Sequence, residues 1–437
     1  MNIVQITPGA GAMLCGNCFR DNALVAELRL QGHDVTMIPL YLPLTLDEED
    51  QSADTPIFFS GINVYLEQKY ALFRHEPRWL HRIFRSRRLL KWAAGRAAKT
   101  RAADVGDITL SMLRGEDGKQ ARELEELIEW LKRGPHPDAI CLSNALLVGM
   151  TRRLKAELRS SVVCHLQGED TFLDGLPDSH RAACWEVLSE RARDVDLFIS
   201  PSRYFAELMA RRLDLSVDRV QVIHNGINLE GYRPTDANQA KRSTQNAAPV
   251  LGFFARMCKE KGLDTLVDAY ILIKRRDRVP RLKLHIGGGC GPSDEPFVKE
   301  LRKRLAGAGY IGETAFFPNL NRAEKLDFLS ALSVFSVPAL YGEAFGLYVI
   351  EAMAAGVPVV QPRVAAFPEL IETTGGGVLC EAGRPEALAD AIEGLLLNKS
   401  QSRELAETGR KTVFEEFSAS RMAQRTLLVL EDLKQPA

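Results

Sequence analysis

The chain has 437 residues, and its 56 Lys and Arg against 57 Asp and Glu give a formal net charge of −1 at pH 7. This length exceeds that of a typical single domain, so we expect two large domains or three small ones, and two similar halves fit best. The near-neutral charge excludes a global field for nucleic acid or for an anionic membrane. No run of about 18 apolar residues occurs, as a membrane-spanning helix would need, and we expect a cytoplasmic protein.

The eight cysteines are scattered, mostly in apolar segments, as reduced buried thiols are. One exception is the C-x-x-C spacing of Cys15 and Cys18. A single such pair is a weak redox signal, and without a second pair a zinc site is not expected. We interpret the pair as part of a packed loop, and we expect no metal and no bound cofactor.

The N-terminal segment reads as strand, glycine-bearing loop, helix and strand. Apolar Ile3–Ile6 and Val35–Leu40 predict the two strands, and 17–31 predicts the helix. Gly16 lies in the loop that follows the first strand, at the end of a parallel sheet where ligands bind. The glycines do not match G-x-G-x-x-G, so a dinucleotide site is not indicated.

Residues 74–101 are rich in Arg and Lys, include interleaved Trp and Leu, and contain almost no acid. Such a basic amphipathic stretch could lie on a membrane surface, which would place the protein peripherally at the inner membrane face. The alternative, which we favour, is a helical excursion whose aromatic side chains pack on the sheet and whose basic face is solvated.

Further strands of the first domain are predicted at 139–143, 162–166, 197–200 and 220–223. His165 ends the second of these strands. The acids of 194–196 have the D-x-D spacing of a metal motif, but they precede their strand and so stand at the end of the sheet where no site is expected. We therefore reject a metal site there. Ser202 follows the third strand and is suited to cap the next helix.

A linker is predicted at 234–249, which is polar, aperiodic and without a large apolar residue. The strand and helix pattern restarts at Val250 and predicts a second doubly wound sheet. The domains expected on either side of the linker are 1–233, which also takes the C-terminal helix 417–437, and 250–416.

Two cations follow the first strand of the second domain. Arg256 stands at the end of the apolar strand 251–254, and Lys261 precedes a helix that starts at Leu263. Cations beside a helix start are what a departing diphosphate needs when no metal neutralises its charge. The alternative is a strand-end Arg in a surface ion pair, and the Lys-Gly-Leu-Asp context makes it the weaker interpretation.

The most informative stretch runs from an apolar strand at 332–337 through a loop with Gly342 and Glu343 into a helix expected from about 345 to 355. The unpaired N–H groups of such a helix start can hold an anion. Glu351 lies about 8 Å along the helix axis and its side chain leans back toward the start. The two carboxylates could therefore flank one ligand as hydroxyl acceptors, although any two Glu eight apart are otherwise solvated side chains.

The spacing of Glu343 and Glu351 resembles the E-x7-E signature of retaining glycosyltransferases of the GT-B fold, in particular family 4, the glycosyl transferases group 1. Residues 254–266 resemble the Arg and Lys-Gly donor motif of that family. The resemblance implies an α/β protein of two Rossmann-like doubly wound parallel-sheet domains facing a central cleft. It also implies that the C-terminal helix crosses back to the first domain.

The resemblance further implies a retaining, metal-independent transferase that moves a hexosyl group from a UDP-, GDP- or ADP-sugar to an unidentified acceptor, such as a glycan, a lipid-linked molecule or a small molecule. Arg256 and Lys261 would stabilise the leaving diphosphate, Glu343 would accept from sugar hydroxyls, and Glu351 would accept from the ribose. His165 would face the donor sugar, and Gly16 would contact a phosphate. The remaining donor-binding positions would be Gly342, Ala344, Phe345, Gly346 and Leu347.

Two other functions stay open at this point. A nucleotide-sugar epimerase of similar fold would need an added acid and base constellation, which the sequence does not display. A non-catalytic nucleotide-sugar-binding protein would keep the fold, but the intact set of Arg256, Lys261, Glu343 and Glu351 argues against it.

Overall fold

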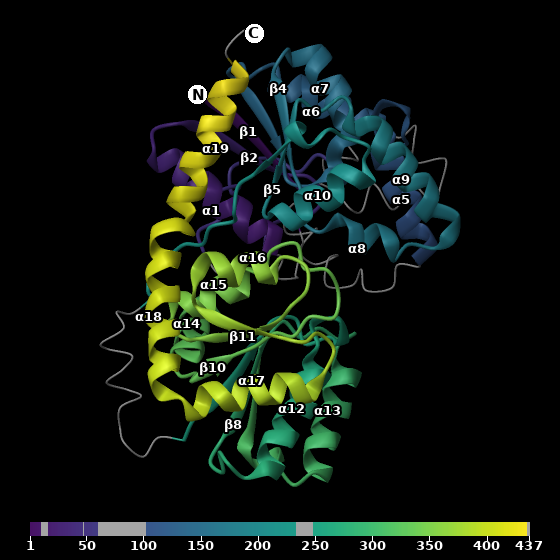
Figure 1. Ribbon diagram of the computed structural model, residues 1–437. Helices are drawn as coiled ribbons and strands as arrows, with labels where there is room; N and C mark the ends of the chain where they lie inside the picture. Colours follow the sequence, from purple (N-terminus) through teal and green to yellow (C-terminus); the bar gives the residue numbers. More distant parts are fainter. Residues whose placement is uncertain (10–15, 47, 60–101, 233–247, 435–437) are drawn as a thin grey trace. The chain divides into compact units, whose positions relative to one another are not determined.

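Two parallel β-sheets organise the chain in the computed structural model, which describes residues 1–9, 16–46, 48–59, 102–232 and 248–434 (Figure 1). Contacts divide the chain into a first unit, Met1–His224 with Met422–Ala437, and a second unit, Asn225–Arg421. The basic stretch at 74–101 and nearly all of the predicted linker lie outside the described residues, so both stay predictions.

The first sheet has the order β2-β1-β3-β4-β5-β6, and all neighbouring strands are parallel. Consecutive residues of its central strands are buried, as expected where helices cover both faces. Its strands are β1 (Asn2–Thr7), β2 (Asp34–Pro39), β3 (Ala139–Leu142), β4 (Ser161–His165), β5 (Leu197–Ser200) and β6 (Val220–Val222). The helical segments described between them are α1 (Gly16–Leu30), α5 (Ala102–Leu113), η2 (Gly115–Asp117), α6 (Ala121–Leu131), η3 (Ala145–Met150), α7 (Thr151–Leu158), α8 (Glu169–Asp174), α9 (Asp178–Ala192), α10 (Arg203–Arg212) and η4 (Val217–Arg219).

The second sheet has the order β12-β11-β10-β7-β8-β9 and is also parallel throughout. Counted from its own first strand this is the Rossmann order 3-2-1-4-5-6. Its strands are β7 (Val250–Phe254), β8 (Lys283–Gly288), β9 (Thr314–Pro318), β10 (Val334–Phe335), β11 (Val359–Pro362) and β12 (Gly377–Cys380). Its helical segments are η5 (Lys259–Lys261), α12 (Leu263–Arg276), α13 (Glu295–Gly307), η6 (Ile311–Glu313), α14 (Arg322–Ser330), α15 (Leu347–Ala354), α16 (Phe367–Thr374), α17 (Pro385–Leu397) and α18 (Lys399–Glu416).

One helix in each unit begins at a side-chain cap that its sequence provides. Ser202 caps α10 by accepting a hydrogen bond from the backbone N–H of Phe205 at 3.1 Å, which confirms the predicted cap. Asn321 caps α14 and forms a capping box with Glu324, in which each side chain accepts from the backbone of the other. The second cap fixes the start of the helix that carries Lys325.

The C-terminal helix α19 (Ala419–Lys434) packs into the core of the first unit. Met422, Ala423, Leu427 and Leu430 are buried in one cluster with side chains of that unit's sheet and of α1. Where the chain enters and leaves the second unit, Ile227 and Ser418 form a parallel bridge. The polypeptide therefore crosses between the units twice, as the family resemblance implied.

Several element bounds differ from the predicted ones. The strand expected over 332–337 is the short β10, since only Val334 and Phe335 have ladder partners. The helix expected from about Phe345 begins at Leu347, because Gly346 takes a left-handed conformation (φ 95°) immediately before it. No helix in the described parts of the chain combines the length and the apolarity needed to cross a bilayer.

We predict that Gly262→Ala destabilises the second unit. Gly262 has φ 71°, and a Cβ atom there would lie 1.9 Å from the carbonyl oxygen of Pro338. We expect a loss of at least about 2 kcal/mol of unfolding free energy, from the left-handed backbone and the clash together. Urea denaturation measures it. Gly394→Ala, in α17 with open space around its Cα, is the control and should be neutral or stabilising by about 0.5 kcal/mol; equal destabilisation by both would contradict this account.

Candidate functional site

The order of the second sheet places a candidate site between the loops that follow β7 and β10. The connections leave these two neighbouring strands in opposite directions, and ligands of doubly wound sheets bind in the crevice at such a point. The loop after β7 carries Arg256 and Lys261, and the loop after β10 carries Glu343. Residues that are 82 positions apart in the sequence meet here.

The two loops are held together by their backbones. The N–H of Leu340 donates to the carbonyl oxygen of Glu260 at 2.9 Å. Gly262 lies so close to Pro338 that no side chain would fit between them. These contacts fix the base of each loop, and they set the positions from which the side chains of the candidate site extend.

Four side chains form a cluster at this point, which we call the Lys261 cluster: Lys261, Tyr341, Glu343 and Tyr348. The ammonium group of Lys261 lies 2.6 Å from Oε2 of Glu343 and also donates to the hydroxyl of Tyr341. Its Nζ is 4.8 Å from the ring centroid of Tyr341 and 5.2 Å from that of Tyr348, within the range of cation–π attraction. Lys261 and Glu343 have side-chain exposures of 18% and 15%, so water screens their attraction only in part.

Both tyrosines of the Lys261 cluster donate to the same carboxylate oxygen. The hydroxyl of Tyr348 is 2.8 Å from Oε2 of Glu343, and that of Tyr341 is 3.0 Å away. Burial raises the pKa of Tyr348 well above its usual value, and the charge of Glu343 raises it further. The Tyr348 phenol therefore stays protonated and acts as a donor. The sequence predictions included neither tyrosine, although Tyr348 and Glu351 are the two polar side chains of the apolar segment Leu347–Ala354 and Tyr348 could have been noticed.

Arg256 lies at the end of β7, but it is paired. Its Nε and Nη2 donate to the carboxylate of Asp294, the latter at 2.8 Å to Oδ1. This hydrogen bond raises the pKa of Arg256, so the guanidinium stays charged. Asp294 is itself buried and also accepts from the N–H of Gly291. The ion pair that the sequence analysis gave as the alternative for Arg256 is thus present. It orients the guanidinium, and the Arg256 side chain remains 59% exposed.

Glu351 occupies the fifth position of α15, as predicted, and its partner is Lys325 of α14. The Lys325 Nζ lies 3.0 Å from Oε1 of Glu351, and both side chains are mostly buried. Among the described contacts, this ion pair is separate from the Lys261 cluster. The structure thus places the two acids of the E-x7-E spacing in two different ion pairs, each with its own lysine.

The remaining predicted positions of the second unit surround the start of α15. Gly346 caps this helix, and Ala344 and Phe345 are buried beneath it. The carbonyl oxygen of Glu343 accepts from the N–H of Ala366 at 3.3 Å, which ties the loop to the segment before α16. Gly342 and Leu347, which flank this turn, are partly exposed.

Gly16 and His165 belong to the first unit. Gly16 begins α1 and is exposed. His165 ends β4 with an exposure of 3%, and its Nε2 has no hydrogen-bond partner in the part of the chain that the structure describes. Burial lowers the pKa of His165 well below its usual value, and the charge of Arg20 lowers it further.

Arg20 belongs to a buried ion pair with Asp21, which the sequence predictions missed. Nη2 of Arg20 lies 2.8 Å from Oδ1 of Asp21 and donates to the carbonyl oxygen of Ser143, and both charged side chains are almost fully buried. The available signal was a pair of adjacent opposite charges, Arg20 and Asp21, in the first half of α1. The acids of 194–196, rejected as a metal site, pair with bases instead: Asp196 with Lys155, and Asp194 with Arg152.

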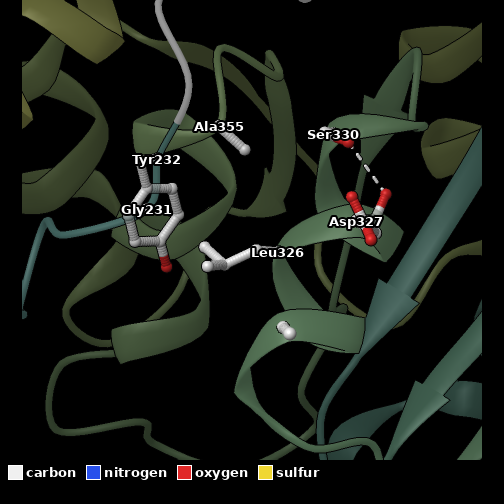
Figure 2. Close-up of a pocket in the computed structure, with 7 residues that line it drawn as sticks. Gly231, Tyr232, Leu326, Asp327, Ser330 and Ala355 are labelled. Carbon is white, nitrogen blue, oxygen red and sulfur yellow. Dashed lines mark hydrogen bonds between the residues drawn. The ribbon is translucent and has the colours of Figure 1, made fainter.

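A cavity of about 140 Å³ lies elsewhere in the second unit, and Figure 2 shows residues that line it. Leu326, Asp327 and Ser330 of α14 line one side of it, and Tyr232 and Ala355 also face it. None of the predicted site residues lines this cavity. The candidate site therefore stays at the ends of β7 and β10.

Family models match both halves of the chain. The model of the glycosyl transferases group 1 matches residues 235–412, and that of Glycosyltransferase Family 4 matches residues 107–230. The chain belongs to the glycosyl transferases group 1. The family predicted from the E-x7-E spacing is thus confirmed. The Lys261 cluster lies within residues 235–412, the part of the chain that matches the model of the glycosyl transferases group 1.

Similar proteins include the D-inositol 3-phosphate glycosyltransferase of Streptomyces scabiei, 31% identical over 206 residues, or 46% of each chain. The match spans about half the length of such curated relatives. Sucrose-phosphate synthase from Thermosynechococcus elongatus has a TM-score of 0.69 at 19% identity, covering 99% of this chain and 98% of that chain. HepE from Anabaena, solved in complex with UDP, has a TM-score of 0.70 at 17% identity, covering 99% and 100%. These structures confirm the predicted GT-B fold of two Rossmann-like domains.

We predict that His165 makes the free energy of unfolding of this glycosyltransferase depend on pH. Its pKa is lower in the folded than in the unfolded protein, so as pH falls below about 6.5 the unfolded chain takes up a proton that the folded chain does not. Above about pH 6.5 the free energy of unfolding should not depend on His165. As the pH is lowered further, the free energy of unfolding should decrease by up to about 1.4 kcal/mol per pH unit.

The measurement is the urea midpoint of wild type and His165→Gln across about pH 7.5 to 5.5. The variant should lose less stability than wild type over this range. His136→Gln, at an exposed position, serves as the control and should follow wild type. Parallel curves for wild type and His165→Gln would contradict the prediction.

Proposed function

We propose that the protein is a retaining glycosyltransferase that moves a hexosyl group from a nucleotide diphosphate sugar to an acceptor hydroxyl. The observation that carries the proposal is the Lys261 cluster, in which a cation and a carboxylate stand together at the switch point of the second sheet. A nucleotide sugar needs both, because its diphosphate is anionic and its sugar offers hydroxyl donors. Family membership supports the same donor class.

The second unit binds the donor in this proposal. Lys261 and Arg256 are directed to the diphosphate, Glu343 to the sugar hydroxyls, and Glu351 to the ribose. One N–H of Lys261 reaches Glu343 and another reaches Tyr341, so the third is left for a phosphate oxygen. Arg256 binds Asp294 through Nε and Nη2 and keeps Nη1 for the ligand. The roles predicted for Gly16 and His165, which belong to the first unit, stay predictions.

The reaction that we propose breaks the bond between the anomeric carbon and the diphosphate oxygen and forms a bond from that carbon to the acceptor oxygen on the same face. The acceptor proton passes to the departing phosphate oxygen, so no protein nucleophile is required. Fixed cations stabilise the negative charge that develops on the leaving group. The backbone amides at the start of α15, around Gly346 and Leu347, add partial positive charge.

Two parts of the proposal are to be identified by experiment: the nucleotide base of the donor, and the acceptor. A thermal-shift screen over UDP-, GDP- and ADP-sugars identifies the donor, and UDP leads because solved structures of HepE contain UDP and UDP-glucose. An inositol phosphate is the first acceptor to test, since the similar D-inositol 3-phosphate glycosyltransferases are named for one. Proton NMR of the product reads the anomeric configuration, and inversion would refute the retaining assignment. An epimerase would yield an altered nucleotide sugar and no glycoside.

We predict that Glu343→Ala lowers kcat by about 100- to 1,000-fold. The substitution removes the proposed acceptor for sugar hydroxyls and leaves the Lys261 ammonium without its anionic partner. The rate of nucleoside diphosphate release, with and without acceptor, measures this loss of turnover. Glu381→Ala removes an exposed carboxylate of the same unit and is the control, with wild-type turnover expected. Wild-type turnover by Glu343→Ala would exclude the proposed role.

We predict that turnover does not require a divalent ion. Arg256 and Lys261 carry the charge that a metal would otherwise supply to the leaving diphosphate. After dialysis against EDTA, kcat should stay within about twofold of the untreated enzyme. A loss that added Mg²⁺ or Mn²⁺ restores would show that the fixed cations are not sufficient.

A further inference from the structure

Glu343 is bound asymmetrically by the protein. Its Oε2 accepts from three groups on three segments: Lys261 of η5, Tyr341 of the loop after β10, and Tyr348 of α15. In the described parts of the chain, its Oε1 accepts no hydrogen bond from the protein. One oxygen of the carboxylate is therefore saturated and the other is available to a ligand.

This arrangement fixes the orientation of the carboxylate. A carboxyl group held by a single cation can rotate about its terminal torsion, which is broad and roughly twofold. Donors from three directions on one oxygen restrict that rotation and define the direction of the lone pairs on the other. Hydrogen bonds of this kind, with an ionised acceptor, are roughly twice as strong as neutral ones.

We propose that Tyr348 is a positioning residue for donor recognition: by holding Oε2 of Glu343, it directs Oε1 to accept a hydroxyl of the hexose in the nucleotide sugar. This inference rests on the proposed function and deepens it. It assigns to Tyr348 a contribution to recognition of the sugar and none to recognition of the nucleoside diphosphate.

Tyr348 suits this role better than Tyr341. The Tyr348 ring is anchored in α15 between Phe335 and Phe367, with centroid distances of 6.4 and 6.5 Å, so its hydroxyl approaches Glu343 from a fixed element. Tyr341 lies in a loop and also accepts from Lys261. Removal of the Tyr348 hydroxyl leaves its ring, its packing and its contact with the Lys261 ammonium in place.

The experiment compares Tyr348→Phe with wild type in two binding titrations, one with UDP-glucose, GDP-mannose or ADP-glucose, whichever wild type binds, and one with the matching free diphosphate. We expect the affinity for the nucleotide sugar and the kcat/KM of transfer to fall by about 10- to 100-fold. The affinity for the free diphosphate should stay within about twofold. A merely structural role would lower both affinities together.

Tyr310→Phe is the matched control, because Tyr310 is a tyrosine of the same unit whose ring contacts Tyr270, outside the Lys261 cluster. It should behave as wild type in both titrations. Wild-type values for Tyr348→Phe, or equal losses for nucleotide sugar and free diphosphate, would overturn the inference while leaving the proposed function intact. Failure of wild type to bind any of the three nucleotide sugars would instead overturn the proposed function, and the inference with it.

Discussion

The ion pair between Lys261 and Glu343 is the interaction on which the candidate site depends. Both groups are largely withdrawn from water, and burial of a charge is costly unless the charge is paired. Each therefore stabilises the other while no ligand is bound. Two tyrosine hydroxyls and two aromatic rings complete the surroundings of the pair. A site built in this way holds opposite charges ready for a ligand that itself carries an anionic and a hydroxyl-bearing part.

The fold explains why these two residues meet. Parallel strands deliver the loops at their carboxyl ends to one edge of the sheet, and β7 and β10 are neighbours although about 80 residues separate them. Gly262 and the backbone bond from Leu340 to Glu260 then bring the loops into contact. The glycine has a structural role here: it permits an approach between two backbones that a side chain would prevent. The Lys-Gly pair of the sequence thus joins Lys261 of the candidate site to the glycine that allows its loop to approach the loop after β10.

Sequence reasoning located the elements and the charged groups because both leave local traces. Apolar runs predicted most of the strands, and the spacing of Glu343 and Glu351 led to the family that the comparison confirmed. The sequence contains no comparable local signal for which side chains will contact one another in the folded protein. Asp294, Lys325 and Tyr348 became visible only when the fold brought them to Arg256, Glu351 and Glu343. Each lies 5 to 38 positions from its partner, and no periodic pattern connects them.

The pairings also separate the two acids of the E-x7-E spacing by their surroundings. Glu351 faces a lysine from a capped helix, so its partner is held by secondary structure. Glu343 lies in a loop and depends on side chains for its orientation, since within the described residues its own backbone contributes only the contact to Ala366 and the turn to Tyr341. A loop carboxylate needs several donors to reach the precision that a helix gives to Glu351. The two tyrosines supply those donors, and for this reason the orientation of Glu343 is more sensitive to a single lost hydroxyl group than that of Glu351.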